Sequence, residues 1–158
     1  MAARKILTVF GTRPEAIKLF PLLHALTDDP RFISFACVSA QHRAMLDQVL
    51  DIAGSCPCTI STCCAPIRRS TCSTATLLTG LGRVMDAENP DWVVIQGDVA
   101  TAMACALSAF SRKISVAHVE ARLRSGPIHP PWPDEVTRKI SARLLSCTGP
   151  DQDRRGRA

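Results

Sequence analysis

Charged side chains in this sequence gather directly after short apolar runs that resemble β-strands. Four motifs have this placement: Gly11–Glu15, Ala40–Arg43, Gln96–Asp98 and His118–Glu120. If the strands are parallel, their carboxyl ends share one edge of a sheet, and ligands of such sheets bind beyond that edge. Arginines and carboxylates that converge there suit an anionic substrate handled by acid–base chemistry.

The elements that must position these motifs alternate along the chain. The pattern predicts strands at Lys5–Gly11, Ile33–Ala40, Trp92–Gly97 and Ser115–Val119. It predicts helices at Pro14–Leu26, Leu46–Ala53, Leu77–Glu88, Thr101–Phe110 and Pro133–Leu145, with a kink at Pro21. We therefore expect an α/β fold, a doubly wound parallel sheet with helices on both faces.

Composition limits the classes of function. The 158 residues suit one domain, and the net charge of +5 comes from 19 basic and 14 acidic residues. Several arginines fall in a central tract and in the tail without interleaved aromatic residues, which argues against nucleic acid. No apolar run has the length of a signal-peptide core or a membrane span, so we expect a cytoplasmic protein with no membrane partner.

The first motif has the physical character of an anion site. Gly11 permits a tight turn into a helix N-terminus, and Arg13 and Lys18 add positive charge. It lacks the spaced glycines and the Lys-Ser/Thr pair of a P-loop, and it does not match Gly-x-Gly-x-x-Gly. We therefore expect no nicotinamide or other cofactor. A plain strand–helix turn with two solvated cations remains the alternative.

Taken together, the motifs resemble those of the non-hydrolysing UDP-N-acetylglucosamine 2-epimerases, which have a two-domain, glycosyltransferase-B-like fold. The resemblance rests on five segments in the family's order, covering most of residues 5–54 and 77–145: Gly11–Lys18, Ser39–Leu50, Pro90–Asp98, His118–Ala121 and Pro131–Arg138. It implies that this chain is the Rossmann-like N-terminal half of that fold. Family members form homodimers.

The resemblance implies inversion at C2 of UDP-N-acetylglucosamine, giving UDP-N-acetylmannosamine, by elimination and re-addition of UDP. Residues at matching positions then become candidates for acid–base work: Asp98, Glu120 and Asp134. The candidates for binding the substrate are Arg13, Lys18, Gln41 and Arg138. No metal takes part in this chemistry.

Each acid also has a purely structural interpretation. Asp98 could cap the following helix, Glu120 could be a paired carboxylate at the sheet edge, and Asp134 could favour a helix N-terminus. The chain also departs from the family pattern. Asp134 replaces a glutamate and Arg122 a glycine, and further departures fall at Gln96, Val99, Pro127, Pro130 and Thr137. Because a misplacement of ~1 Å can cost on the order of a hundredfold in rate, these departures predict reduced activity.

The resemblance stops within residues 55–74, where five of the eight cysteines lie. Cys56 and Cys58 are separated by one residue and Cys63 and Cys64 are adjacent, which does not match paired zinc-ligand spacing. One choice of codons, read one base out of frame, encodes Val-Pro-Val-His-Asp-Leu-Asp-Leu-Leu-Arg-Pro-Asp-Gln-Thr-Leu, which resembles the missing family segment. The tail after residue 146 can be read similarly in another frame.

These observations divide the chain into an α/β domain at residues 1–146, containing the aberrant tract 55–74, and an aberrant tail at residues 147–158. The family's C-terminal domain is then absent, and the tract loses a family strand and its substrate-facing loop. Two other interpretations stay open. One is a non-catalytic remnant or dimerising domain, and the other is a different nucleotide-sugar enzyme of the same fold, such as a hydrolysing epimerase.

The frame hypothesis makes a direct prediction. Resequencing the gene should reveal compensating single-base changes that flank the codons for residues 55–74, or a sequencing error whose correction restores the family segment. Stop codons or unrelated residues in the alternative frame would refute it.

Overall fold

The computed structural model describes residues 3–39, 59–62, 74–119, 134–144 and 147–148. Within them, six strands form one sheet: β1 (Arg4–Phe10), β2 (Phe32–Val38), β3 (Thr59–Thr62), β4 (Trp92–Gln96), β5 (Ser115–Val119) and β6 (Cys147–Thr148). Four helices accompany them: α1 (Arg13–Asp28), α3 (Thr74–Glu88), α4 (Ala100–Ser111) and α5 (Asp134–Leu144). The predicted helix at Leu46–Ala53 lies outside the described residues.

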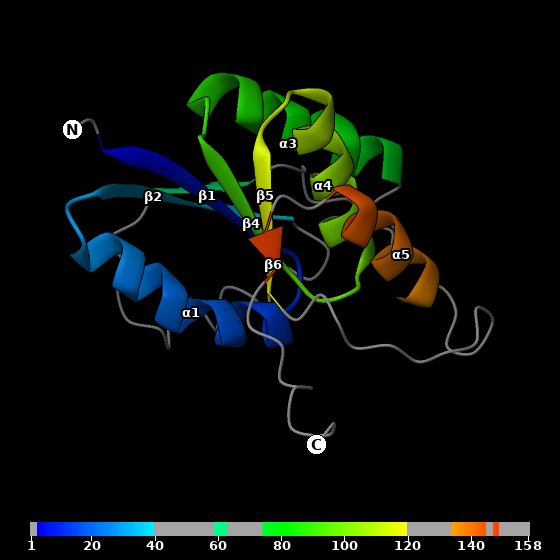
Figure 1. Ribbon diagram of the computed structural model, residues 1–158, viewed down its shortest axis with the longest axis horizontal. Coiled ribbons are helices and arrows are strands. Elements are labelled where there is room, and N and C mark those ends of the chain that lie inside the picture. Colours follow the sequence, from blue (N-terminus) through cyan, green and yellow to red (C-terminus); the bar gives the residue numbers. More distant parts are fainter. Residues whose placement is uncertain (1–2, 40–58, 63–73, 120–133, 145–146, 149–158) are drawn as a thin grey trace, which may run out of the picture.

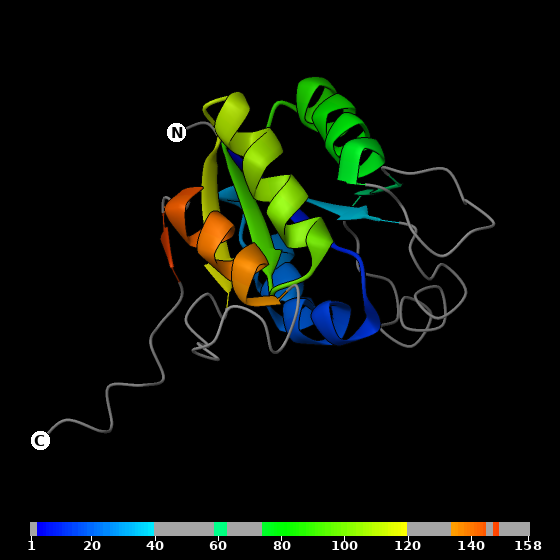
Figure 2. The ribbon, with the colours of Figure 1, turned by 90° about the vertical axis from the view of Figure 1, so that its right-hand side faces the viewer.

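All neighbouring strands are parallel, in the order β3-β2-β1-β4-β5-β6. From β1 the chain moves outward to β2 and β3 along one half of the sheet. From β3 it crosses back to β4 and then moves to β5 and β6 along the other half. Right-handed crossovers therefore place α1 on one face and α3, α4 and α5 on the opposite face. Figures 1 and 2 show this arrangement, with α1 alone against its face among the labelled helices. The expected doubly wound parallel sheet is confirmed.

The aberrant tract does not lose its strand, and the expectation that it would is wrong. Residues 59–62 pair in parallel with β2, with Phe35 opposite Thr59 and Val38 opposite Thr62. Two physical reasons account for this. Strand pairing uses the backbone N–H and C=O groups, which every residue other than proline carries. In addition, the segment Thr-Ile-Ser-Thr is rich in β-branched residues. The tail likewise contributes β6, which pairs with β5 at Ala117 and His118.

Alternation along β1 divides the core into two layers. Leu7 and Val9 join a buried cluster with α3 and α4, whereas Ile6 and Phe10 join a second cluster with Leu19 and other residues of α1. Side chains in a strand point alternately to opposite faces, so a strand covered on both sides reads as a continuous apolar run. The run Ile6–Phe10 is therefore apolar because helices cover both faces of the central strand.

The helices begin and end close to where the sequence predicts. Pro14 lies in the first turn of α1, where its missing N–H costs nothing, and α1 continues as one helix past Pro21. Among the described residues, no helix has both the length and the apolar character required to cross a bilayer.

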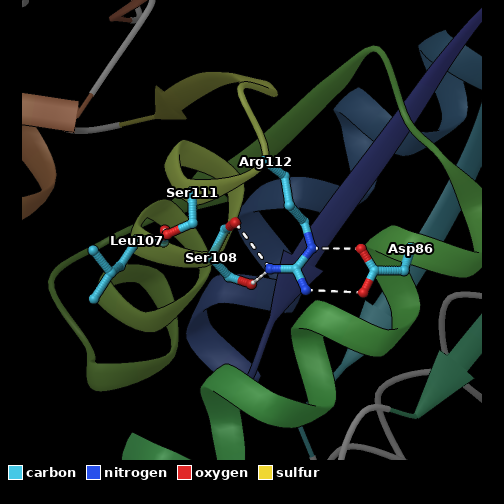
Figure 3. A network of polar contacts seen from close by, with 5 residues as sticks. All are labelled: Asp86, Leu107, Ser108, Ser111 and Arg112. Atoms are coloured by element: carbon cyan, nitrogen blue, oxygen red, sulfur yellow. Dashed lines mark hydrogen bonds and ion pairs between the residues drawn. The ribbon is translucent and has the colours of Figure 1, made fainter.

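An ion pair links α3 and α4 at the surface (Figure 3). The Arg112 guanidinium donates two hydrogen bonds to Asp86, at 2.6 and 2.9 Å, and a third from Nη1 to the Ser108 hydroxyl at 3.1 Å. This contact holds the pKa of Asp86 below its usual range, chiefly through the hydrogen bonds from Arg112. The guanidinium also lies over Gly82 of α3, where a Cβ would be 2.6 Å from Nη2.

The ends of β1 and β2 and the start of α4 approach each other most closely at Gly11. A Cβ on Gly11 would lie 2.3 Å from the Ser39 hydroxyl oxygen and 2.6 Å from that of Thr101. Those two hydroxyls are buried and hydrogen-bonded to each other at 3.0 Å. Only glycine leaves room for this pair, so its requirement at position 11 comes from packing.

We expect Gly11→Ala to destabilise the fold by about 1–3 kcal/mol, since the added methyl group must displace a buried hydrogen-bonded pair. The matched control is Gly82→Ala. Its methyl group must shift only the guanidinium of Arg112, whose ion pair with Asp86 lies at the surface, and alanine favours a helix interior by roughly 1 kcal/mol. Urea unfolding of the two variants should show a lower midpoint for Gly11→Ala alone. Equal midpoints would contradict the close approach at Gly11.

Candidate active site at the carboxyl edge of the sheet

The predicted site lies where the strand order reverses. β1 and β4 are neighbours in the sheet, and the connections that follow them lead to opposite faces. The turns after the two strands therefore diverge, and ligands of doubly wound sheets bind between such turns. Here these are Gly11–Thr12 after β1 and Gly97–Val99 after β4.

Glu15 organises the turn after β1. Its Oε2 accepts hydrogen bonds from the backbone N–H of Gly11 at 2.8 Å and of Thr12 at 2.7 Å, and from the Thr12 hydroxyl at 2.9 Å. Glu15 as a whole is 4% exposed. Thr12 is the N-cap residue of α1 and Glu15 the third helical residue, so the carboxyl reaches back to amides that the helix itself leaves unbonded.

Burial and hydrogen bonding act on Glu15 in opposite directions. Loss of hydration raises the pKa of Glu15, the three hydrogen bonds lower it, and the nearby negative charge of Asp98 raises it further. The net pKa lies above its usual value because desolvation is the largest of these effects. The two carboxyls are thus electrostatically coupled, although they come from different turns.

The turn after β4 is held by the neighbouring strand β5. Gly97 has φ +77°, a conformation that favours glycine, and its carbonyl oxygen lies 2.7 Å from Nε2 of the buried His118. Its N–H points to the carbonyl oxygen of Val119 at 3.4 Å. Both contacts fix the backbone immediately before Asp98, so the direction of Asp98 depends on the end of β5.

The geometry does not support a cap position for Asp98. The N-cap residue of α4 is Val99, which places Asp98 one residue before the cap. Asp98 is partly exposed at the carboxyl edge and close enough to Glu15 to influence its charge. This placement suits a group that meets a ligand.

The two cations predicted for the site both come from α1. Arg13 is the first residue of the helix and Lys18 lies in its second turn, and both side chains are exposed. The structure therefore places Arg13 and Asp98 at the turns of one edge of the sheet, with Lys18 about one helical turn beyond Arg13 on α1.

The remaining predicted site residues are only partly placed. Gln41 and Glu120 lie outside the described residues, although Glu120 directly follows the last residue of β5. Asp134 is the first residue of α5 and Arg138 lies one turn later, while their side chains are outside the description. Their roles remain predictions.

Sequence reasoning missed two residues of this edge. Glu15 enters the sequence-based prediction only as the end of the motif Gly11–Glu15, although the pattern Thr12-x-x-Glu15 is that of a capping box. His118 was read as part of a motif, and the signal for its structural role is a polar residue at a buried strand position. In the described part of the chain, no three His, Cys, Asp or Glu residues are grouped as a metal site would require.

Comparison with known proteins identifies the family. The family model for UDP-N-acetylglucosamine 2-epimerase matches residues 24–148. This chain belongs to the UDP-N-acetylglucosamine 2-epimerase family. The UDP-N-acetylglucosamine 2-epimerase of Escherichia coli K12 is 46% identical over 140 residues, which is 89% of this chain and 37% of the relative. A putative epimerase of Thermotoga maritima is 41% identical over the same length.

Solved epimerase structures share the fold. A putative epimerase from Listeria monocytogenes superimposes with a TM-score of 0.85 at 37% identity, covering 94% of this chain and 39% of that protein. The Neisseria meningitidis epimerase bound to UDP-GlcNAc superimposes with a TM-score of 0.80 at 38% identity, covering 89% and 38%. The family's Rossmann-like α/β fold is thus confirmed, and this chain spans less than half the length of these relatives.

The raised pKa of Glu15 predicts a specific pH dependence. Between its usual value of 4.5 and its higher folded value, the folded state binds more protons than the unfolded state, so the stability due to this group falls as pH rises. Because glutamine does not titrate, the stability of the parent relative to Glu15→Gln should fall as the pH rises above the usual value of 4.5, as measured by urea unfolding.

Asp86→Asn is the matched control with the opposite sign. The pKa of Asp86 is lowered, so its contribution is present above the usual value of 3.8 and is lost as the pH falls toward the lower folded value. The parent should therefore gain stability relative to Asp86→Asn as pH rises. If the stability of the parent relative to Glu15→Gln also rose with pH, desolvation would not be the largest effect on the pKa of Glu15.

Proposed function

We propose that this chain is the N-terminal, substrate-binding half of a non-hydrolysing UDP-N-acetylglucosamine 2-epimerase. The observation that carries the proposal is the Gly97–Asp98 turn. It stands at the reversal of strand order in a chain of this family, and the neighbouring strand holds it through His118. The proposed substrate is supported by related structures described as bound to UDP-GlcNAc, from Neisseria meningitidis, and as a complex with UDP-GlcNAc and UDP, from Methanocaldococcus jannaschii.

The proposed reaction needs a base and an acid on opposite faces of the sugar. One group removes the C2 proton as the C1–O bond to UDP breaks, which leaves a glycal. A second group protonates C2 from the other face, and UDP adds back to C1. We assign these proton transfers to Asp98, Glu120 and Asp134. Asp98 has the best-supported place because its turn is fixed by β5 and it is partly exposed at the ligand edge.

The departing UDP carries charge that must be stabilised. Arg13 and Lys18 are exposed on α1 beside the turns of the site, and they would attract the pyrophosphate. Gln41 and Arg138 are the further substrate-binding residues of the proposal. Asp134, one methylene shorter than the family's glutamate, would reach the sugar less well and slow one proton transfer.

A binding domain without turnover is the second candidate, and the span of the chain favours it for these 158 residues tested alone. They cover 37% of the Escherichia coli relative. The resemblance to the family implies a second domain that supplies much of the nucleotide site. Without that domain the pyrophosphate stays in water, where each exposed charge contact contributes only about 1 kcal/mol or less. Water would also compete for the glycal intermediate.

The decisive experiment uses a hybrid enzyme. The matching 140 residues of the Escherichia coli epimerase are replaced by this chain, and C2 inversion is followed by deuterium uptake from solvent. We expect turnover in the hybrid and none from the 158-residue chain alone. Asp98→Asn in the hybrid should lower kcat roughly 10²–10⁴-fold, since it removes a proton-transfer group.

Asp86→Asn serves as the control, because it makes the same chemical change on α3, three residues from the loop that leads into the amino end of β4. It should leave kcat unchanged. Turnover by the chain alone that is lost on Asp98→Asn would show that half of the fold suffices. A folded hybrid whose rate is equal with and without Asp98 would remove Asp98 from the mechanism.

A further inference from the structure

The turn after β1 has the donors of a phosphate site, but they are already used. In doubly wound folds the amides at this turn and the positive end of the following helix bind phosphate. Here the N–H groups of Gly11 and Thr12 both donate to Oε2 of Glu15, at 2.8 and 2.7 Å. The Thr12 hydroxyl donates to the same oxygen at 2.9 Å. One carboxylate oxygen thus has three donors directed at it.

We propose that Glu15 acts as an internal anion that fills the phosphate position of the β1–α1 turn, and that it positions the turn carrying Asp98. A substrate phosphate therefore does not bind to the Gly11 and Thr12 amides. It would have to displace a buried carboxylate that is better placed, and it would meet the repulsion of a like charge at the same helix end.

The other carboxylate oxygen connects Glu15 to the second turn of the site. A Cβ on Gly97 would lie 3.8 Å from Oε1 of Glu15, so the carboxyl lies beside the Gly97 backbone, one residue before Asp98. Nε2 of His118 lies 2.7 Å from the Gly97 carbonyl oxygen. Glu15 and His118 therefore both border the Gly97 turn. Glu15 acts through this turn and is a positioning residue.

This arrangement deepens the proposed function and rests on it in one respect. If the substrate is a UDP-sugar, its pyrophosphate must be met by side-chain cations such as Arg13 and Lys18, or by groups elsewhere, because the turn amides are occupied. The edge between β1 and β4 is then left to the sugar, next to Asp98. The inference about Glu15 itself depends only on the geometry of the turn.

Inorganic phosphate is the probe that tests the inference. Purified 158-residue chain, Glu15→Ala and Glu15→Gln are titrated with phosphate at pH 7 while the amide NMR signals of Gly11 and Thr12 are followed. We expect no saturable shift in the parent chain. In Glu15→Ala the released amides should show a saturable shift in the millimolar range. In Glu15→Gln the side-chain amide oxygen of glutamine can accept the same hydrogen bonds, so the Gly11 and Thr12 signals should again show no saturable shift with phosphate.

Two measurements keep the test decisive. Glu88→Ala removes one carboxylate at the far end of α3, with the same change in net charge, and should leave both amide signals insensitive to phosphate. If Glu15→Ala does not fold, hydrogen exchange in Glu15→Gln replaces it. Exchange at Gly11 and Thr12 should quicken about fivefold, because a charged acceptor is exchanged for a neutral one, and should not change at Leu7.

Specific results would overturn the inference. Saturable phosphate shifts at Gly11 and Thr12 in the parent chain would show that phosphate displaces the Glu15 carboxylate from these amides. Absence of a gain in a folded Glu15→Ala, or unchanged exchange in Glu15→Gln, would show that Glu15 does not occupy the turn. The proposed function is tested separately by the hybrid enzyme. If the hybrid shows no turnover, the proposed function fails, but a gain of phosphate binding in Glu15→Ala would still support the inference about Glu15.

Discussion

The reversal of strand order between β1 and β4 is the constraint on which this structure depends. The chain leaves these two adjacent strands toward opposite faces, so their turns diverge at the carboxyl edge. The two turns need glycine for different reasons: Gly11 lies against the Ser39 and Thr101 hydroxyls, whereas Gly97 has a left-handed backbone. The predicted site residues Arg13 and Asp98 lie at this edge.

At this edge the positive end of α1 is balanced mostly by a charged group of the protein itself. The buried carboxylate of Glu15 balances the positive end of α1 and accepts hydrogen bonds from the amides of Gly11 and Thr12. Asp98 lies in the other turn, after β4. The positive end of a helix in this position would otherwise attract any small anion. An internal acid makes the turn rigid and leaves recognition of the substrate to side chains.

The Cys-rich tract shows how much of a strand depends on its side chains. β3 pairs with β2 although its sequence lies in the tract that has lost its family resemblance. Pairing with β2 uses backbone hydrogen bonds, and Thr59, Ile60 and Thr62 suit extended backbone. A strand next to the centre of the sheet would tolerate less, because its side chains are packed on both faces, as in the apolar run of β1.

The sequence alone determined the central features of the fold. The apolar runs at β1 and β4, the glycines after them and the apolar faces of α3 and α4 predict a doubly wound sheet, because burial on both sides of a strand leaves a local signature. The hydrogen bonds from Gly11 and Thr12 to Glu15 are local as well and follow the Thr12-x-x-Glu15 pattern. Only the tertiary structure decided how the two turns at the edge meet. The contact of His118 with the Gly97 backbone and the approach of Glu15 to Gly97 join segments that are distant in the sequence. Such contacts arise from the order of the strands, which no local pattern of residues encodes.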